Sequence, residues 1–330
     1  MVQKSSAPHL TLEQQADLLL QRGLAADREA LIGRLRAVNY YRLKGYLHPF
    51  RLVDSQGKRL DAFRPGTTLD TIWRRYNFDR RLRIILLDAI ERIEVALRSR
   101  LVHHFVLAHG PFGHLRQENL PGFARKSDRA GWLPIIRAYL TFKGRPQSPH
   151  GQWLQKLNAE RKRALSAKNK FVGYFHENYG DSHSQLPLWM ACELMTCDTA
   201  LSLAYAMDRE LFKKVATDFG FPDDQLLSWT KGIFTLRNAC AHHARIWNRV
   251  GGATPCMPGT TNKNPNWYVQ PRFAPDRMGH ALTVCHHWLG KVSSTSQWKA
   301  RLFDFFDEYP EIPLNEMGIP ANWRTHPLWT

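Results

Sequence analysis

The chain has 330 residues, of which 46 are lysine or arginine and 29 are aspartate or glutamate, so its formal net charge is +17 at neutral pH. A hydrophobic content of 43%, with 11 tryptophans and 17 phenylalanines, can supply a substantial core, and we expect the chain to fold on its own. The charge favours a polyanionic partner; because no apolar run is long enough to span a bilayer and the basic residues are dispersed, we expect nucleic acid rather than a membrane.

The five cysteines are scattered and odd in number, so they do not form a disulfide framework. Ligand-type side chains occur together, as in Cys285-His286-His287, but no pair of cysteines has the short spacing of a zinc knuckle. We therefore expect no metal ion and no other cofactor. The first 20 residues lack the apolar core of a signal peptide, and we expect a cytoplasmic location.

The N-terminal region, residues 1–64, is predicted to form a small helical lobe. Thr11-Leu-Glu-Gln14 has the pattern of a capping box and begins a helix that reaches Gln21. A second helix, from about Asp27 to Val38, has Asp27 as its expected N-cap. The aromatic segment 39–51 is expected to be a helix end or turn followed by extended chain.

Residues 65–250 are predicted to form the main helical domain. Thr67 or Thr68 begins a long helix whose apolar residues recur every three and four positions toward Phe105. A basic insertion near residues 110–180, broken by glycine and proline, is the best candidate for an RNA-facing surface, and Lys162 and Arg163 are expected to bind RNA there. The alternative is an ordinary solvated helix face.

Three further segments complete a mainly α fold. Residues 188–207 are largely apolar and are expected to form a buried helix, and residues 223–247 are expected to form a helical pair. Residues 251–330 are predicted to be a C-terminal extension that packs on the bundle and contains a helix near Met278 to Val292. Two tryptophans of these segments are assigned to the core: Trp189 and Trp247.

The segment from Leu236 to Arg249 carries the strongest chemical signal. If it is helical, a polar stripe bordered by Arg237 runs along it. The stripe consists of Asn238 and the residues four, seven and eleven positions after it: His242, Arg245 and Arg249. A histidine can take the proton of a ribose 2′-hydroxyl, and an arginine can stabilise charge on phosphoryl oxygens. A hydrogen-bonded structural histidine is the alternative, and it is the first interpretation for His243, which points to a different face.

Arg237-Asn-Ala-Cys-Ala-His242 resembles the motif of the HEPN superfamily of helical ribonucleases, an arginine and a histidine separated by four residues, the first of which is commonly asparagine. Residues 40–51 resemble the N-terminal signature of Abi-like proteins of the AbiD and AbiF type, which are abortive-infection factors. Three segments resemble the helices that precede the motif in that family: 78–82, 90–98 and 186–195. The resemblance extends from about Leu12 to Arg249.

The resemblance implies a HEPN-type helical bundle and a homodimer, in which Arg237, Asn238 and His242 of both chains form one composite cleft. It further implies a metal-independent endoribonuclease of prokaryotic antiphage defence, which leaves a 2′,3′-cyclic phosphate and a 5′-hydroxyl. Arg237 would stabilise the scissile phosphate, His242 would transfer protons, and Asn238 would orient them. A phosphate-binding track would continue along the chain: Arg245, Asn248 and Arg249.

Two carboxylates are candidates to support this site. Glu94 and Glu91 lie in a helix that can pack beside the motif, and either can hold Arg237 by a charged hydrogen bond. Ordinary surface pairing with Arg98 or Arg92 is the alternative.

Two residues of the aromatic segment are candidate RNA contacts. Tyr41 can stack on unpaired bases and Arg42 can hold RNA through its guanidinium plane. The alternative is that Tyr40 and Tyr41 pack in the core.

Two other functions are compatible with the sequence. One is a noncatalytic HEPN-like module that binds a structured noncoding RNA or a partner protein and acts as a regulator; a damaged motif would predict it, and here both the arginine and the histidine are intact. The other is a DNA-binding regulator, suggested by the short N-terminal helices and the basic charge, but the segment from Arg28 to Arg36 has few side chains suited to reading bases.

Overall fold

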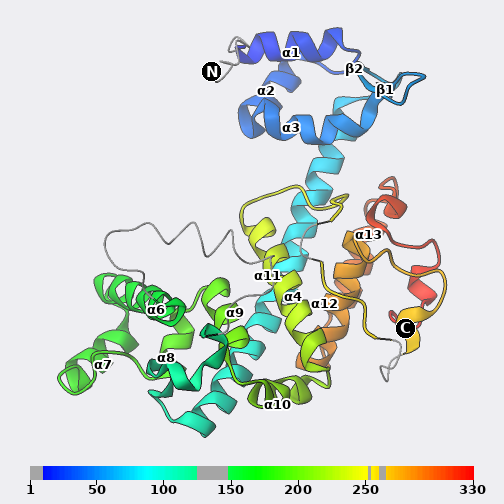
Figure 1. Ribbon diagram of the computed structural model, residues 1–330. Helices are drawn as coiled ribbons and strands as arrows, with labels where there is room; N and C mark the ends of the chain where they lie inside the picture. Colours follow the sequence, from blue (N-terminus) through cyan, green and yellow to red (C-terminus); the bar gives the residue numbers. More distant parts are fainter. Residues whose placement is uncertain (1–9, 125–147, 252–253, 260–264) are drawn as a thin grey trace.

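The computed structural model describes residues 10–124, 148–251, 254–259 and 265–330 (Figure 1). The fold is mainly helical, as predicted, and the named strands within these ranges form one two-stranded hairpin. None of the described helices combines the length and the apolar content needed to cross a membrane.

A single long helix, α4 (Leu69–His109), runs through the molecule and organises the other elements (Figure 1). Thr68 is its N-cap and accepts a hydrogen bond of 3.1 Å from the backbone N–H of Thr71, which confirms the predicted start. The predicted apolar stripe is buried along the helix, with Leu82, Leu86 and Ile90 fully inaccessible. The helix continues four residues beyond Phe105 and ends at His109.

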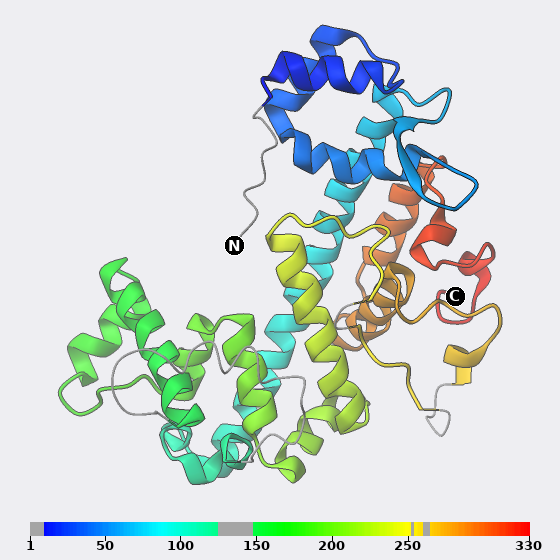
Figure 2. The same cartoon turned by 45° about the horizontal axis from the view of Figure 1, so that its top comes forward.

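The N-terminal elements gather at the first turns of α4 (Figures 1 and 2). The capping box at Thr11 and the N-cap at Asp27 are confirmed. An antiparallel hairpin places Arg51 opposite Phe63. The elements of this region are α1 (Leu12–Gln21), α2 (Arg28–Val38), α3 (Tyr40–Leu47), β1 (Arg51–Val53) and β2 (Arg59–Phe63).

The prediction for residues 39–51 is wrong in its first half, because α3 is a regular helix. The side chain of Asn39 accepts a hydrogen bond of 2.9 Å from the N–H of Tyr41, so a new helix begins with only Asn39 between it and the end of α2. The 3-10 turn η1 (His48–Phe50), which contains Pro49, then leads into the extended strand β1.

Four helices from the second half of the chain pack along α4: α10 (Arg209–Phe219), α11 (Asp223–Ala241), α12 (Met278–Val292) and α13 (Trp298–Asp307). The bounds of α12 coincide with the predicted helix.

At the other end of α4 lie α6 (Pro149–Ser166) and α7 (Lys170–Tyr179) with short 3-10 turns before them: η2 (Gly113–Leu115), η3 (Gln117–Asn119) and η4 (Pro121–Phe123). Three more such turns, η6 (Pro265–Tyr268), η7 (Leu314–Met317) and η8 (Trp323–Thr325), occur near the C-terminus. Part of the predicted basic insertion, residues 125–147, lies outside the described residues.

The segment 188–207 is not the single buried helix that its apolar character predicts. It divides into α8 (Leu188–Ala191), the 3-10 turn η5 (Cys192–Leu194) and α9 (Cys197–Ala206). The break arises because Met195 is extended and Thr196 caps the next helix, accepting a hydrogen bond of 3.3 Å from the N–H of Thr199. Trp189, assigned to the core from the sequence, is 48% exposed, whereas Trp247 is buried as predicted.

Candidate active site

The motif lies at the C-terminal end of α11, and the helix stops there. Ala241 is the last helical residue, His242 is the C-cap, and His243 has a left-handed backbone with φ of 58°. The N–H of Ala244 donates to the carbonyl of Ala239 at 2.8 Å, and the N–H of His243 donates to the carbonyl of Cys240 at 3.0 Å. These two bonds define a Schellman motif, in which the left-handed position is usually glycine.

This helix end corrects the predicted polar stripe. Arg237 and Asn238 lie on α11 and His242 closes it, but Arg245, Asn248 and Arg249 belong to the non-helical segment that follows. The polar stripe inferred from helical spacing is therefore wrong beyond His242, and the phosphate-binding role of Arg245, Asn248 and Arg249 stays a prediction. His242, Arg245 and Arg249 are nevertheless exposed, while Asn248 is half-buried.

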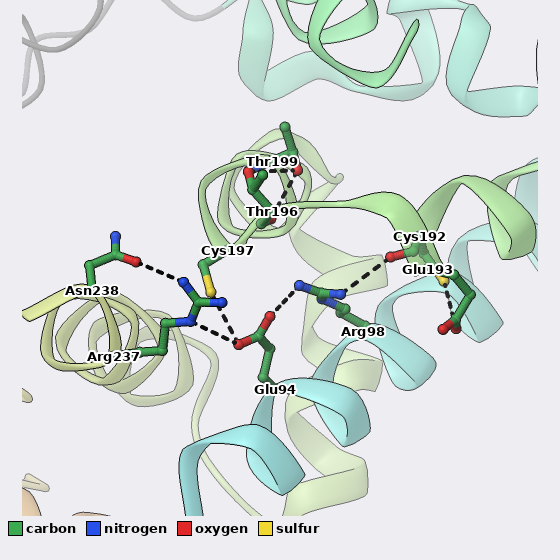
Figure 3. A network of polar contacts seen from close by, with 9 residues as sticks. All are labelled: Glu94, Arg98, Cys192, Glu193, Thr196, Cys197, Thr199, Arg237 and Asn238. Atoms are coloured by element: carbon green, nitrogen blue, oxygen red, sulfur yellow. Dashed lines mark hydrogen bonds and ion pairs between the residues drawn. The ribbon is translucent and has the colours of Figure 1, made fainter. Parts of the chain in front are cut away.

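Arg237 is held in place by side chains from two helices (Figure 3). Its Nε lies 3.8 Å from Oε2 of Glu94 on α4, and its Nη1 lies 3.4 Å from Oδ1 of Asn238, the next residue on α11. The Arg237 side chain is 40% exposed, against 10% for that of Glu94. The Arg237 side chain is thus anchored to the protein through two of its nitrogens while part of it remains exposed to solvent.

Glu94 is a buried carboxylate with several partners. Arg98, one turn along α4, forms an ion pair with Oε1, and Cys197 at the start of α9 donates to Oε2 at 3.1 Å. Burial, reinforced by the hydrogen bond to Glu94, raises the pKa of the Cys197 thiol to about 12, so the sulfur keeps its proton and acts as a donor. Both alternatives considered for Glu94, pairing with Arg237 and with Arg98, are therefore observed together. Glu91 is exposed, and the carboxylate beside Arg237 is that of Glu94.

A second buried carboxylate fixes the turn that follows His242. Asp79 of α4 is fully inaccessible, and its Oδ1 accepts the backbone N–H of Ile246 at 3.0 Å and of Trp247 at 2.8 Å. Its Oδ2 accepts the hydroxyl of Tyr46 at 2.6 Å and pairs with Arg83. Each oxygen of this carboxylate thus has two donors, and both donors to Oδ1 come from the turn after His242.

Arg83 completes the connection between α4 and the turn, because its Nη1 also donates to the carbonyl of Ala244 at 2.9 Å. This cluster was missed from the sequence, although a signal was present: Asp79 occupies the buried stripe of α4, three residues before Leu82, where an ionised side chain needs compensating partners.

Helix α3 contacts the same turn and changes the interpretation of two predicted RNA-binding residues. Arg42 donates to the carbonyl of His243 at 2.5 Å, and Arg245 donates to the carbonyl of Gly45. Both guanidinium groups therefore connect the N-terminal elements to the motif, in addition to any contact with a ligand. Tyr41 is 77% exposed, so the alternative that it packs in the core is wrong.

Lys162 and Arg163 lie on α6, at a distance from this cluster along the bundle. α6 packs against α9, which in turn packs against α11 (Figures 1 and 2). Both side chains are exposed, and Arg163 pairs with Glu160 on the same helix. The fold thus places them on a surface different from the one that bears His242.

A family model described as Abi-like protein matches residues 34–248, which include every residue of the two carboxylate clusters and the motif itself. Neither the curated proteins nor the solved structures contained a match to the chain.

Proposed function

The chain belongs to the Abi-like protein family, which points to a part in abortive infection, and from this premise we propose that it is a metal-independent endoribonuclease of prokaryotic antiphage defence. We assign it to the HEPN type of helical ribonuclease on the Arg237-to-His242 motif. The observation that carries the proposal is the state of Arg237: its side chain is 40% exposed and is anchored by Glu94 and Asn238.

The chemistry follows from the three motif side chains. His242 removes the proton of a ribose 2′-hydroxyl, and the resulting oxygen forms a bond to phosphorus while the bond from phosphorus to the 5′-oxygen breaks. A protonated histidine supplies the proton that the 5′-oxygen takes up, so the products are a 2′,3′-cyclic phosphate and a 5′-hydroxyl. Arg237 stabilises the charge that develops on the phosphoryl oxygens, and Asn238 holds the guanidinium of Arg237 in position.

The donor set near the motif supports a mechanism without a metal ion. Glu94 is the one carboxylate that contacts the motif among the described residues, and its two oxygens are already engaged by Arg98, Cys197 and Arg237. A cation bound to Glu94 would have to displace the guanidinium groups of Arg98 and Arg237, which already compensate this buried carboxylate.

We infer that the active form is a homodimer with a composite site. Ile84 and Val95 of α4 are each 56% exposed, and residues eleven apart on a helix point within about 20° of one another. This side of α4, which also bears the exposed Glu91 between the two apolar residues, runs beside the Glu94 cluster, since Val95 follows Glu94 directly. A second copy packed on it would bring two motif helices together, and His242 of the partner subunit would then supply the second proton-transfer group.

A second candidate function is a noncatalytic module that binds a structured noncoding RNA or a partner protein. One observation favours it: within the described residues of a single chain, the His242 ring has no hydrogen-bonding partner to orient it. In the ribonuclease proposal that orientation comes from the RNA or from the second copy.

Cleavage of a labelled RNA pool in EDTA, followed by identification of the product ends, tests the proposal. His242→Ala should abolish cleavage, because the proton-transfer group is lost, while RNA binding should remain nearly intact. The matched control is His243→Gly, which removes the adjacent imidazole but suits the left-handed backbone there. Equal cleavage by His242→Ala and wild type after rigorous purification would eliminate the ribonuclease proposal in favour of the noncatalytic module.

A further inference from the structure

One face of α3 is exposed, aromatic and basic. Tyr41, Lys44 and His48 are spaced by three and four residues, so they share a side of the helix and its continuation, and all three are exposed. Tyr41 is 77% exposed, the largest value among the large hydrophobic side chains of the described residues. We call the surface formed by these three residues with Arg59 and Arg245 the α3 surface.

The cations of the α3 surface are gathered without compensating acids. Among the described residues, Lys44, Arg59 and Arg245 form no ion pair with a carboxylate. The pKa of His48 is lowered by burial and then by nearby positive charges, those of Arg59, Arg51, Arg245 and Lys44. Of these, Arg51 is the one whose charge is offset, by Asp61 at 2.9 Å. The surface therefore carries a concentrated positive field that an anion would relieve.

Two of these guanidinium groups are already oriented. Arg245 donates to the carbonyl of Gly45, and Arg59 donates to the carbonyl of His48 at 3.3 Å. Each uses a single N–H in this contact, and both side chains remain exposed. An arginine held in this way loses less conformational freedom when its remaining donors bind a phosphate.

The α3 surface adjoins the turn after the motif, because Arg245, one of its members, follows His242 by three residues and donates to Gly45 of α3. Arg42 of the same helix donates to the carbonyl of His243, the residue directly after His242, at 2.5 Å. Figure 2 shows the C-terminal end of α11 directed toward the N-terminal elements, so a chain that leaves the motif in this direction meets α3.

We propose that the α3 surface binds a single-stranded stretch of RNA next to the scissile phosphate, with Tyr41 stacked on an unpaired base and the cations on the backbone. The proposal rests on the ribonuclease function above and adds the substrate class. An exposed tyrosine ring flanked by cations suits single strands, because the faces of bases within a duplex are already stacked and closed to it.

Binding of a labelled 12-nucleotide RNA to the His242→Ala protein, measured by fluorescence anisotropy, tests this surface separately from cleavage. Tyr41→Ala should weaken binding of the single strand roughly five- to hundredfold, the range typical of losing one stacked base. Lys44→Glu should weaken it and lower the slope of log affinity against log salt by about one. The matched control is Lys214→Glu, an exposed lysine on α10 with the same change in charge.

The single strand should also bind more tightly than a duplex of the same length. Equal affinity for the two RNAs, or equal effects of Lys44→Glu and Lys214→Glu together with no effect of Tyr41→Ala, would overturn the proposal. If these variants bind normally and the wild type still cleaves RNA, this inference fails while the proposed function stands. If binding depends on the α3 surface and no cleavage occurs, the surface stands and the proposed ribonuclease activity fails. A protein that binds no RNA refutes both.

Discussion

Replacing Asp79 with asparagine tests whether this carboxylate holds the turn after His242. The substitution keeps the shape but turns one acceptor oxygen into an NH₂ donor. That donor must face either the two backbone N–H groups of Ile246 and Trp247 or the donors Tyr46 and Arg83, since both oxygens now accept. Either orientation puts donor against donor in a site where the Asp79 side chain is fully buried.

The expected cost is large because Arg83 loses its counter-charge while its side chain is only 5% exposed. Breaking a buried ion pair from one side costs about 3–5 kcal/mol. Tyr46→Phe removes a single hydrogen bond to the carboxylate and should cost about 1.5–3 kcal/mol. The Tyr46 hydroxyl is a dependable donor, because burial and the Asp79 charge raise its pKa.

The assay is urea unfolding combined with hydrogen exchange of the amides of residues 246 and 247. Asp79→Asn should lower the free energy of unfolding and accelerate exchange at both amides. The matched control is Asp88→Asn on the same helix, whose half-exposed carboxylate pairs with Arg92 and Arg301 and whose loss should cost at most about 1 kcal/mol. Equal stability and equal exchange in the two variants would refute the role assigned to Asp79.

Three further expectations concern assembly, the basic surface and pH. Val95→Arg should shift the protein to monomer in sedimentation experiments and reduce cleavage. The control Leu107→Arg, at a 73% exposed position near the end of the same helix, should do neither, and a dimer that survives Val95→Arg would disprove the α4 interface. Reversing Lys162 and Arg163 to glutamate should weaken RNA binding and lower the salt slope by about two if α6 follows the backbone, and unchanged values would remove α6 from the binding surface. Burial lowers the pKa of His280 to about 4, so as pH falls from about 6.5 to 4 the unfolded chain takes up a proton that the folded chain refuses, and stability is lost by at most on the order of 3 kcal/mol. His280→Gln should make the free energy of unfolding less dependent on pH over this window. A pH dependence identical to that of the wild type would show that His280 does not cause the loss of stability at low pH.

Much of the fold could be predicted because its helices begin with local signals. Thr11, Asp27 and Thr68 each cap a helix through a hydrogen bond within three residues, and such signals are present in the sequence itself. The long apolar stripe of α4 is similarly local, because one periodicity holds over many turns.

The end of α11 was mispredicted because its signal is absent from the sequence. A Schellman motif is usually marked by glycine at the left-handed position. Here that position is His243, so the sequence predicts a helix that continues beyond its true end at Ala241. A similar difficulty affects segment 188–207, where Thr196 in an apolar run ends one helix and begins another.

The arrangement of the site depends on contacts that no local pattern encodes. Glu94 and Cys197 are 103 residues apart, and Asp79 and Ile246 are 167 apart. Pairing of Glu94 with Arg98 is local, because the two residues are four apart on α4, but its simultaneous pairing with Arg237 follows from how α11 packs on α4.

The contact between Arg42 and the carbonyl of His243 also affects the order of events during synthesis. These residues are 201 positions apart, and the N-terminal partner leaves the ribosome long before the other is made. At roughly 5–20 residues per second, the gap corresponds to about ten to forty seconds during which α3 is present without the turn that it holds. A nascent chain therefore cannot complete the proposed site until residue 243 has been made and has left the ribosome, so the folding of α3 and the action of the protein on RNA are separated in time.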